Sequence, residues 1–321
     1  MKSSRNSAPQ LPRWQQGLLH IINLRPSEVE RTLLMFAFYT ATSMGILWLE
    51  VSSAALFLEE YGASSLPWIY IFSAGVGFSL SFIYSWMQRF LPLRWAIVLI
   101  AVLMAIPILL FRWGLDFEPL LLFTVFTMRL WTEAIYGLND LNVAITANQL
   151  FNIREIKRTF PLVSSGNLVA DVLSGFSVYL LVNLVGLKNV LMLSFLVMMA
   201  GSATLLYLSF NYEHAFPDSR KRQAEASGDE HHSAQRLRGS MGKYVTLLFS
   251  FFVLAQIVMY LIEFEYLTQL ELRLEVDEIA AFLGIFSGLL GLIELLTQWF
   301  TSSRLIERQG VFTVTSILPL S

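Results

Sequence analysis

The sequence predicts an all-α membrane protein, a bundle of long apolar helices. Three observations predict this class. The chain of 321 residues is 55% hydrophobic and only 14% charged, whereas a soluble domain carries about 25% charged residues. Its mean hydropathy is +0.58. Apolar runs long enough to cross a bilayer recur along the whole chain, and each crossing needs about 20 residues.

Eight complete spans and the beginning of a ninth are expected. The complete spans fall at 31–58, 67–87, 95–113, 119–140, 161–186, 189–210, 243–267 and 279–301. The ninth begins near Val311 and meets the last residue, Ser321, before the roughly 20 residues of a crossing are complete. We therefore expect the chain to be truncated.

The leader, 1–30, is mostly polar. It forms either a short apolar face on the membrane surface or a loosely ordered tail; the apolar face would consist of Trp14, Leu18, Ile21 and Ile22. No cleavable signal peptide is visible. Ser27 and Glu30 have the spacing of a capping box and predict the start of the first helix.

Basic residues are segregated between the two sides of the predicted bundle. With the N-terminus in the cytoplasm, 18 of the 22 Lys and Arg residues fall in inner segments. The outer loops hold only Arg112, Lys188 and Arg273, and Arg129 lies within a span. This positive-inside bias predicts a multi-pass protein of the bacterial inner (plasma) membrane with a cytoplasmic N-terminus. The chain has no cysteine, which excludes disulfides and cysteine metal sites.

A polar linker, 211–242, divides the spans into a six-helix N-terminal half, 31–210, and a second group, 243–321. The linker is rich in charge and low in aliphatic residues, so we expect it to be mobile. It contains His231 and His232. Adjacent histidines in such a segment are usually solvated, and no metal site is predicted.

The two groups of spans look related. Ile71-Phe72-Ser73 in the second span recurs as Ile285-Phe286-Ser287 in the eighth, 214 residues later. Two copies of a six-span unit in parallel orientation resemble the organisation of the major facilitator superfamily. The resemblance implies a major-facilitator-type bundle with a complete N-terminal half and a truncated C-terminal half.

Four polar residues form a stripe on the fourth span. Arg129, Glu133, Tyr136 and Asp140 lie close to one line along a helix. Facing lipid, these charges would cost several kcal/mol, so the stripe must face protein or a water-filled cavity. Arg129 and Glu133 can pair along the helix. The stripe is either part of a substrate or proton pathway or a buried ion pair that fixes packing.

Other spans supply candidate partners for the stripe. The first span has Glu50 on one face with Tyr39 and Ser43, and Glu50 is the second carboxylate expected to meet Arg129. The fifth span carries Asn167 and Asp171 with Ser174 on one face. Secondary candidates lie on the seventh and eighth spans. They are Gln256, Glu263, Glu294 and Gln298, and Glu263 belongs either to the site or to the outer membrane surface.

Small residues also form stripes, which allow helices to approach closely. Gly166, Ala170 and Ser174 recur every four residues. A second stripe contains Gly284, Gly288 and Gly291, and Gly75 and Gly77 interrupt the second span. We interpret all of these as packing positions. No phosphate-binding loop, metal-spaced histidine set or nucleophile elbow is present, so an enzyme is not predicted.

The segment "EIKRTFPLVSSGNLVADVLSG", 155–175, resembles a motif of the bacterial and plastid ATP/ADP carrier-type nucleotide transporters. The matching positions are Lys157, Arg158, Phe160, Pro161, Leu162, Asn167, Ser174 and Gly175. The resemblance implies nucleotide exchange by alternating access. One feature departs from the family, because the first span carries Glu50 and lacks the lysine of the family's Lys-Asp pair. Nucleotide phosphates need several cations, and Arg129 is the one cation predicted within a span.

The function predicted is therefore secondary active transport by alternating access, ATP/ADP carrier-like, for nucleotides or another anionic metabolite. One alternative is a non-transporting membrane module that anchors or regulates a cytosolic domain. The other is a proton-coupled facilitator for a non-nucleotide small molecule. The expected partners are a small-molecule substrate, the lipid bilayer and, for the second reading, a cytosolic domain fused or associated beyond residue 321. No nucleic-acid partner and no cofactor are predicted.

Overall fold

The computed structural model describes residues 25–26, 28–212 and 240–298. Helices contain 93% of these residues, and the described part has no strand. In chain order the helices are α2 (Val29–Tyr61), the short 3-10 helix η1 (Ala63–Ser65), α3 (Leu66–Phe90), α4 (Leu93–Gly114), α5 (Glu118–Leu150), α6 (Ile153–Val185), α7 (Leu187–Asn211), α9 (Ser240–Glu271) and α10 (Val276–Thr297). The all-helical prediction is confirmed.

Several helices extend beyond the predicted spans, and some predicted segments lie outside the described residues. α6 begins at Ile153, where Asn152 and Glu155 form a capping box, and Pro161 is accommodated inside the helix. Its membrane-crossing part, Arg158–Val185, lies close to the predicted span 161–186. α5 continues past 140 to Leu150. Ser27, the apolar residues of the leader, most of the linker with its two histidines, and the segment after Val311 are outside the described residues. The N-cap of α2 is Glu28, without a side-chain cap.

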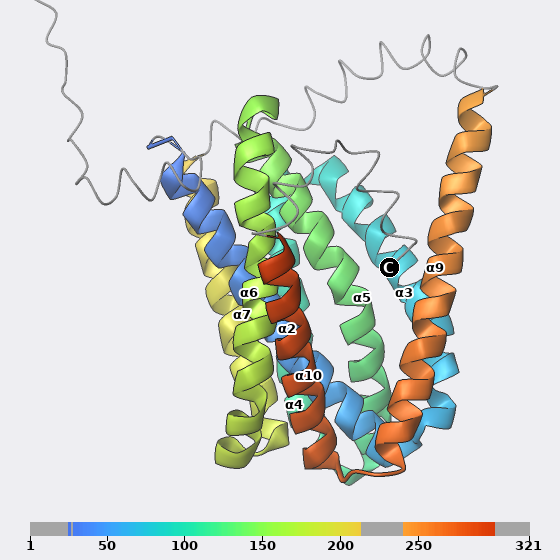
Figure 1. Ribbon diagram of the computed structural model, residues 1–321. Coiled ribbons are helices and arrows are strands. Elements are labelled where there is room, and N and C mark those ends of the chain that lie inside the picture. Colours follow the sequence, from blue (N-terminus) through green and yellow to red (C-terminus); the bar gives the residue numbers. More distant parts are fainter. Residues whose placement is uncertain (1–24, 27, 213–239, 299–321) are drawn as a thin grey trace, which may run out of the picture.

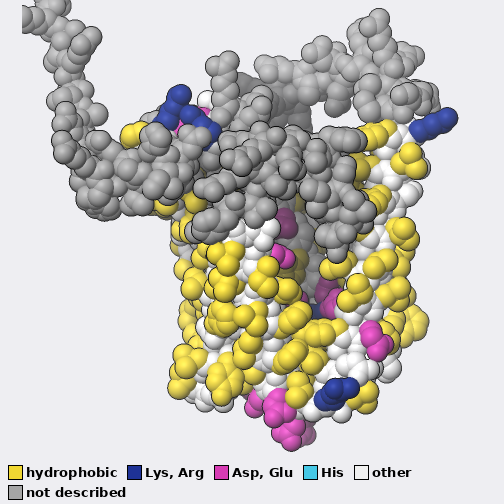
Figure 2. All heavy atoms as spheres, in the orientation of Figure 1, with side chains coloured by type: hydrophobic (Ala, Val, Ile, Leu, Met, Phe, Trp, Pro, Cys, Tyr) yellow, Lys and Arg dark blue, Asp and Glu magenta, His cyan; other side chains and the backbone are white. Residues whose placement is uncertain are grey.

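Among the described residues, seven helices are long and apolar enough to cross a membrane: those at Val29–Tyr61, Ala63–Met87, Leu93–Gly114, Arg158–Val185, Leu187–Asn211, Gly242–Glu271 and Val276–Thr297. They identify a multi-pass integral membrane protein. The expected fourth span, α5, is not among them. It has 33 residues, but the polar stripe reduces its apolar character. Side chains on the visible flank are mainly hydrophobic (Figure 2), which suits contact with hydrocarbon.

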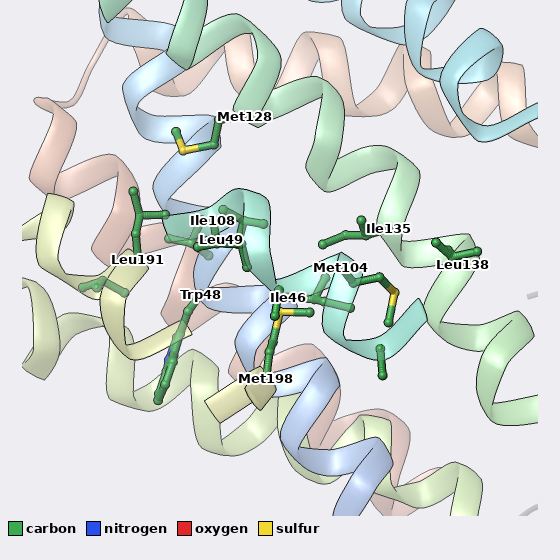
Figure 3. Packing of buried hydrophobic residues seen from close by; sticks show 14 of the residues in the cluster. Ile46, Trp48, Leu49, Met104, Ile108, Met128, Ile135, Leu138, Leu191 and Met198 are labelled. Carbon is green, nitrogen blue, oxygen red and sulfur yellow. The ribbon is translucent and has the colours of Figure 1, made fainter. Parts of the chain in front are cut away.

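α2 runs through the middle of the bundle and packs against α5, α6 and α7 (Figure 1). α4 packs on α7 and α5, α10 on α6 and α2, and α3 on α5. The core lies where α2, α4, α5 and α7 meet. There Ile46, Met104, Ile135 and Met198 are buried against one another's helices (Figure 3). α9 stands at the edge of the bundle, with contacts to η1, α2 and α3.

The helices alternate in direction, so their turns gather at two ends. The α2–α3, α4–α5, α6–α7 and α9–α10 turns lie at the lower end of Figure 1, and the α3–α4 and α5–α6 turns lie at the upper end. This arrangement puts Arg94 and Arg158 at one end and Arg112, Lys188 and Arg273 at the other. The predicted segregation of basic residues is thus compatible with the helix order.

The small-residue stripe of α10 is a packing surface. A Cβ built on Gly175 of α6 would lie 2.5 Å from backbone atoms of Gly284 and Gly288, and one built on Gly291 would lie 2.7 Å from the Cβ of Asp171. The packing interpretation is confirmed there. It is wrong for Gly75 and Gly77 on α3, since no atom lies within 4 Å of a Cβ built at either position.

Candidate functional site

Arg129 is the centre of a buried charged cluster near the middle of α5. Only 1% of its side chain is exposed. Its Nη2 atom lies 2.8 Å from Glu133 Oε1, one turn further along the same helix, and 2.7 Å from Glu263 Oε1 on α9. We call Arg129, Glu133 and Glu263 the charged cluster. The predicted pairing of Arg129 with Glu133 is confirmed, because residues four apart share a helix face.

The second carboxylate that meets Arg129 comes from Glu263. Glu50, the carboxylate expected there, forms no ion pair with Arg129 among the described residues; the ion-pair partners of Arg129 are Glu133 and Glu263. Tyr136 lies about two turns beyond Arg129 on α5, and its hydroxyl donates a hydrogen bond to Glu50 Oε2. Glu50 is thereby bonded to the stripe at Tyr136, further along α5 than Arg129. From the sequence, Glu263 belonged either to the site or to the outer membrane surface. In the structure its side chain is 31% exposed and is part of the charged cluster.

Arg129 has hydrogen-bonding capacity to spare. Its Nε and Nη1 atoms are buried without a hydrogen-bond partner among the described residues, and so is the hydroxyl of Tyr70 on α3. The Tyr70 ring stacks on Tyr260 of α9, with ring centroids 4.3 Å apart. Buried donors are usually paired, so these unsatisfied groups are unusual. They mark the interface of α3, α5 and α9 as a place where a polar group can be accepted.

A cavity of about 240 Å³ lies beside the cluster, between α3, α5 and α9. Glu133 and Tyr260 line it, together with Ser73, Ala74, Gly77, Leu80, Ser81, Ala134, Gly137 and Leu138. Gly77, predicted to be a packing residue, is instead part of this wall. One carboxylate of the charged cluster therefore borders open space. The cavity is large enough for a small polar molecule or several waters.

A second polar group lies further along α5 toward the upper end. The Tyr39 hydroxyl of α2 donates to Asp140 Oδ1 at 2.8 Å, and Asn139 donates to the Ser43 hydroxyl at 3.4 Å. On α6, Asn167 donates to Asp171 at 3.4 Å. Tyr136 and Asp140 of the stripe thus bond to α2, and the carboxylates of Asp140 and Asp171 lie apart from the charged cluster.

The remaining predicted residues lie outside these groups. Gln256 is exposed on α9 and hydrogen-bonds Tyr260, and Glu294 is exposed on α10. Gln298 donates to the Ser164 hydroxyl at 3.1 Å and joins α10 to α6. Within the described residues, no group of three or more His, Cys, Asp or Glu side chains is placed to hold a metal ion.

Sequence reasoning missed Tyr70, Tyr260 and the assignment of Glu263 to the cluster. Tyr70 and Tyr260 lie in apolar runs that look like any lipid-facing segment. Glu263 carried the one available signal, since a carboxylate inside a predicted span needs a partner. That signal does not identify the partner.

Searches against protein-family models, curated proteins and solved structures found no match. The resemblance to the nucleotide carriers therefore stays a prediction from the sequence motif. The arrangement itself can do two things chemically. A guanidinium with free donors can bind an anionic or carbonyl oxygen, and carboxylates that outnumber their cation can take up a proton or a cation.

Proposed function

We propose that the protein is a secondary transporter that works by alternating access. The observation that carries this proposal is the ion pair between Arg129 and Glu263. It joins α5, in the first group of six spans, to α9, the first helix after the linker. A buried ion pair between two groups of helices can be made in one conformation and broken in another, and intramembrane charges are by default candidates for such roles.

The order of the helices supports the proposal. Six α-helices of the described part precede the linker, and α9 and α10 begin close to where a 214-residue repeat would put the counterparts of α2 and α3. A repeated six-span unit in parallel orientation is the organisation of the major facilitator superfamily. The motif at 155–175 adds the resemblance to ATP/ADP carrier-type transporters. We place the protein in the bacterial inner membrane with its N-terminus in the cytoplasm, supported by the basic residues of the upper end.

The substrate we propose is an anionic metabolite. The free Nε and Nη1 donors of Arg129 favour it, because each can donate a charge-assisted hydrogen bond to an anionic oxygen. Nucleotides belong to this class and are indicated by the sequence motif. A nucleoside triphosphate carries three to four negative charges, however, and its phosphates would need further cations beside Arg129. A singly or doubly charged anion suits this cluster better.

A second candidate is a proton-coupled facilitator for a non-nucleotide small molecule. Glu133 and Glu263 share one guanidinium nitrogen, and Glu50 is hydrogen-bonded to Tyr136. Carboxylates thus outnumber the cation, and a buried carboxylate without a counter-charge is normally neutralised by a proton. In this reading Glu263 releases Arg129 when it is protonated, and the same event couples proton entry to helix movement.

Reconstitution in proteoliposomes tests these functions. Uptake of ATP, ADP, inorganic phosphate and a dicarboxylate is measured with and without an imposed pH gradient, and a trapped pH-sensitive dye reports proton flux. Uptake that Arg129→Gln abolishes supports the anion transporter. Dye acidification that requires Glu263 and an added neutral or cationic solute supports the second candidate. If neither substrate uptake nor proton flux is detected, and a cooperative thermal unfolding transition shows that the protein is folded, the result favours the non-transporting membrane module that regulates a cytosolic domain.

A further inference from the structure

A further contact joins α9 to the first group of helices, at the lower end of the bundle. Glu271, the last residue of α9, accepts a hydrogen bond from the backbone N–H of Ala63 at 2.6 Å. Ala63 is the first residue of η1, which leads directly into α3. The two residues are 208 positions apart. Glu271 therefore caps the start of η1, directly ahead of α3, from a different helix.

This cap fills a need of the receiving helix. The first N–H groups of a helix have no partner within it and favour negative charge. Neither Gly62, the N-cap of η1, nor Ser65, the N-cap of α3, provides a side-chain cap. Glu271 supplies both the acceptor oxygen and the charge.

The position of Glu271 on its own helix is unfavourable. The C-terminal end of a helix carries partial negative charge, so a carboxylate there is destabilising, and α9 has no basic residue in its last turn. Local helix energetics therefore do not account for Glu271. Its contact with Ala63 does.

Gly62 makes the approach possible. Its φ is +72° and its ψ is 161°, a conformation that is essentially restricted to glycine. A Cβ built at this position would lie 3.0 Å from Glu271 Oε1. A side chain here would strain the turn between α2 and η1 and press on the carboxylate.

We propose that Glu271 is a latch that holds α9 against the α2–α3 turn and closes the lower end of the bundle. As a gate it rests on the alternating-access function proposed above, but the contact between Glu271 and Ala63 is itself present in the structure. It acts with the Arg129–Glu263 ion pair, which lies about two turns away along α9, so that α9 is fastened at two levels. Opening of the lower end requires both contacts to break. Glu271 is thus a positioning residue for the gate and does not need to contact the substrate.

The test measures the distance across the latch in the full chain in lipid nanodiscs. The protein has no cysteine, so spin labels on Ser64→Cys and Leu272→Cys report it without background; both positions are exposed. Glu271→Ala should raise the population of long distances about tenfold, as expected for loss of a hydrogen bond to a charged group. Gly62→Ala should do the same. Glu271→Gln, which keeps an acceptor oxygen but loses the charge, should lie between the parent and Glu271→Ala.

Glu265→Ala is the matched control. It removes an exposed carboxylate from the same helix, and Glu265 bonds only to Gln269, one turn away, among the contacts described. The latch is ruled out if Glu271→Ala keeps the parent distribution, or if Glu265→Ala shifts it equally. Should Glu271→Ala fail to fold, as seen by size-exclusion chromatography, Gly62→Ala decides in the same way. The distance measurement needs no transport, so an inactive parent would count against the proposed function and leave this test intact.

Discussion

Arg129 and Glu263 are 134 residues apart in the chain, and their side chains meet at 2.7 Å. Arg129 is almost fully buried, while Glu263 keeps 31% of its side chain exposed. The two partners are therefore unequal. Loss of Glu263 leaves Arg129 with Glu133, whereas loss of Arg129 leaves two carboxylates facing each other without a cation.

This asymmetry predicts the order of stability of variants. Arg129→Gln should lower the free energy of unfolding by about 3 kcal/mol, and Glu263→Gln by about 1 kcal/mol, because its partial exposure screens the pair. The double variant should be less destabilised than the sum of the two. Thermal unfolding in detergent measures all three, with Glu265→Gln as the exposed control on the same helix. Equal costs for the two single variants would contradict the pairing.

The helices were predictable from sequence, and so was the pair within α5. Long apolar runs and the four-residue spacing of Arg129 and Glu133 depend on local geometry alone. The start of α6 was also readable, since Asn152 and Glu155 have the capping-box spacing.

The partner from α9 could not be predicted. α9 is apolar on nearly all sides, and most of its residues from Tyr244 to Ile262 are exposed. A helix without a distinct apolar face gives no indication of how it is rotated toward its neighbours. Whether Glu50 or Glu263 pairs with Arg129 depends on that rotation and on Tyr136, which hydrogen-bonds Glu50. The local sequence pattern contains neither the rotation of α9 nor the Tyr136–Glu50 contact.

The Tyr136–Glu50 contact predicts that the loss of stability in Tyr136→Phe depends on whether Glu50 is present. Tyr136→Phe removes the donor and leaves Glu50 without it, which should destabilise the protein by about 2 kcal/mol. Combining it with Glu50→Leu removes the stranded carboxylate as well and should recover part of that loss. Chemical unfolding followed by tryptophan fluorescence measures both. If the double variant were as unstable as the sum of its parts, the two side chains would not be coupled.

The glycine contacts between α6 and α10 predict opposite effects for two similar substitutions. Gly175→Ala would put a Cβ 2.5 Å from the backbone of α10, and backbone cannot move aside cheaply, so α10 must separate from α6. Gly75→Ala meets nothing within 4 Å and should stabilise α3 by up to about 1 kcal/mol through helix propensity. Thermal transitions of both variants check the prediction. A neutral Gly175→Ala would mean that the helices are further apart than described.

Two ion pairs at opposite ends of the bundle provide the last prediction. Arg158 Nη2 lies 2.7 Å from Glu28 Oε1, and Glu28 is only 2% exposed in its side chain. Arg112 lies 2.6 Å from Asp116, whose side chain is 55% exposed. Distance alone would rank the pairs as equal. Burial separates them, because an unpaired buried charge is costly and an exposed pair contributes little.

Arg158→Gln should therefore lower the free energy of unfolding by about 3 kcal/mol, and Asp116→Asn by less than about 1 kcal/mol. Raising the salt concentration should reduce the small effect at Asp116 further, since salt screens exposed charges much more than buried ones. The effect at Arg158 should persist. Unfolding curves at two ionic strengths measure all of these quantities. A cost at Arg158 that vanished in high salt would show that Glu28 is accessible to solvent ions, contrary to its burial between the starts of α2 and α6.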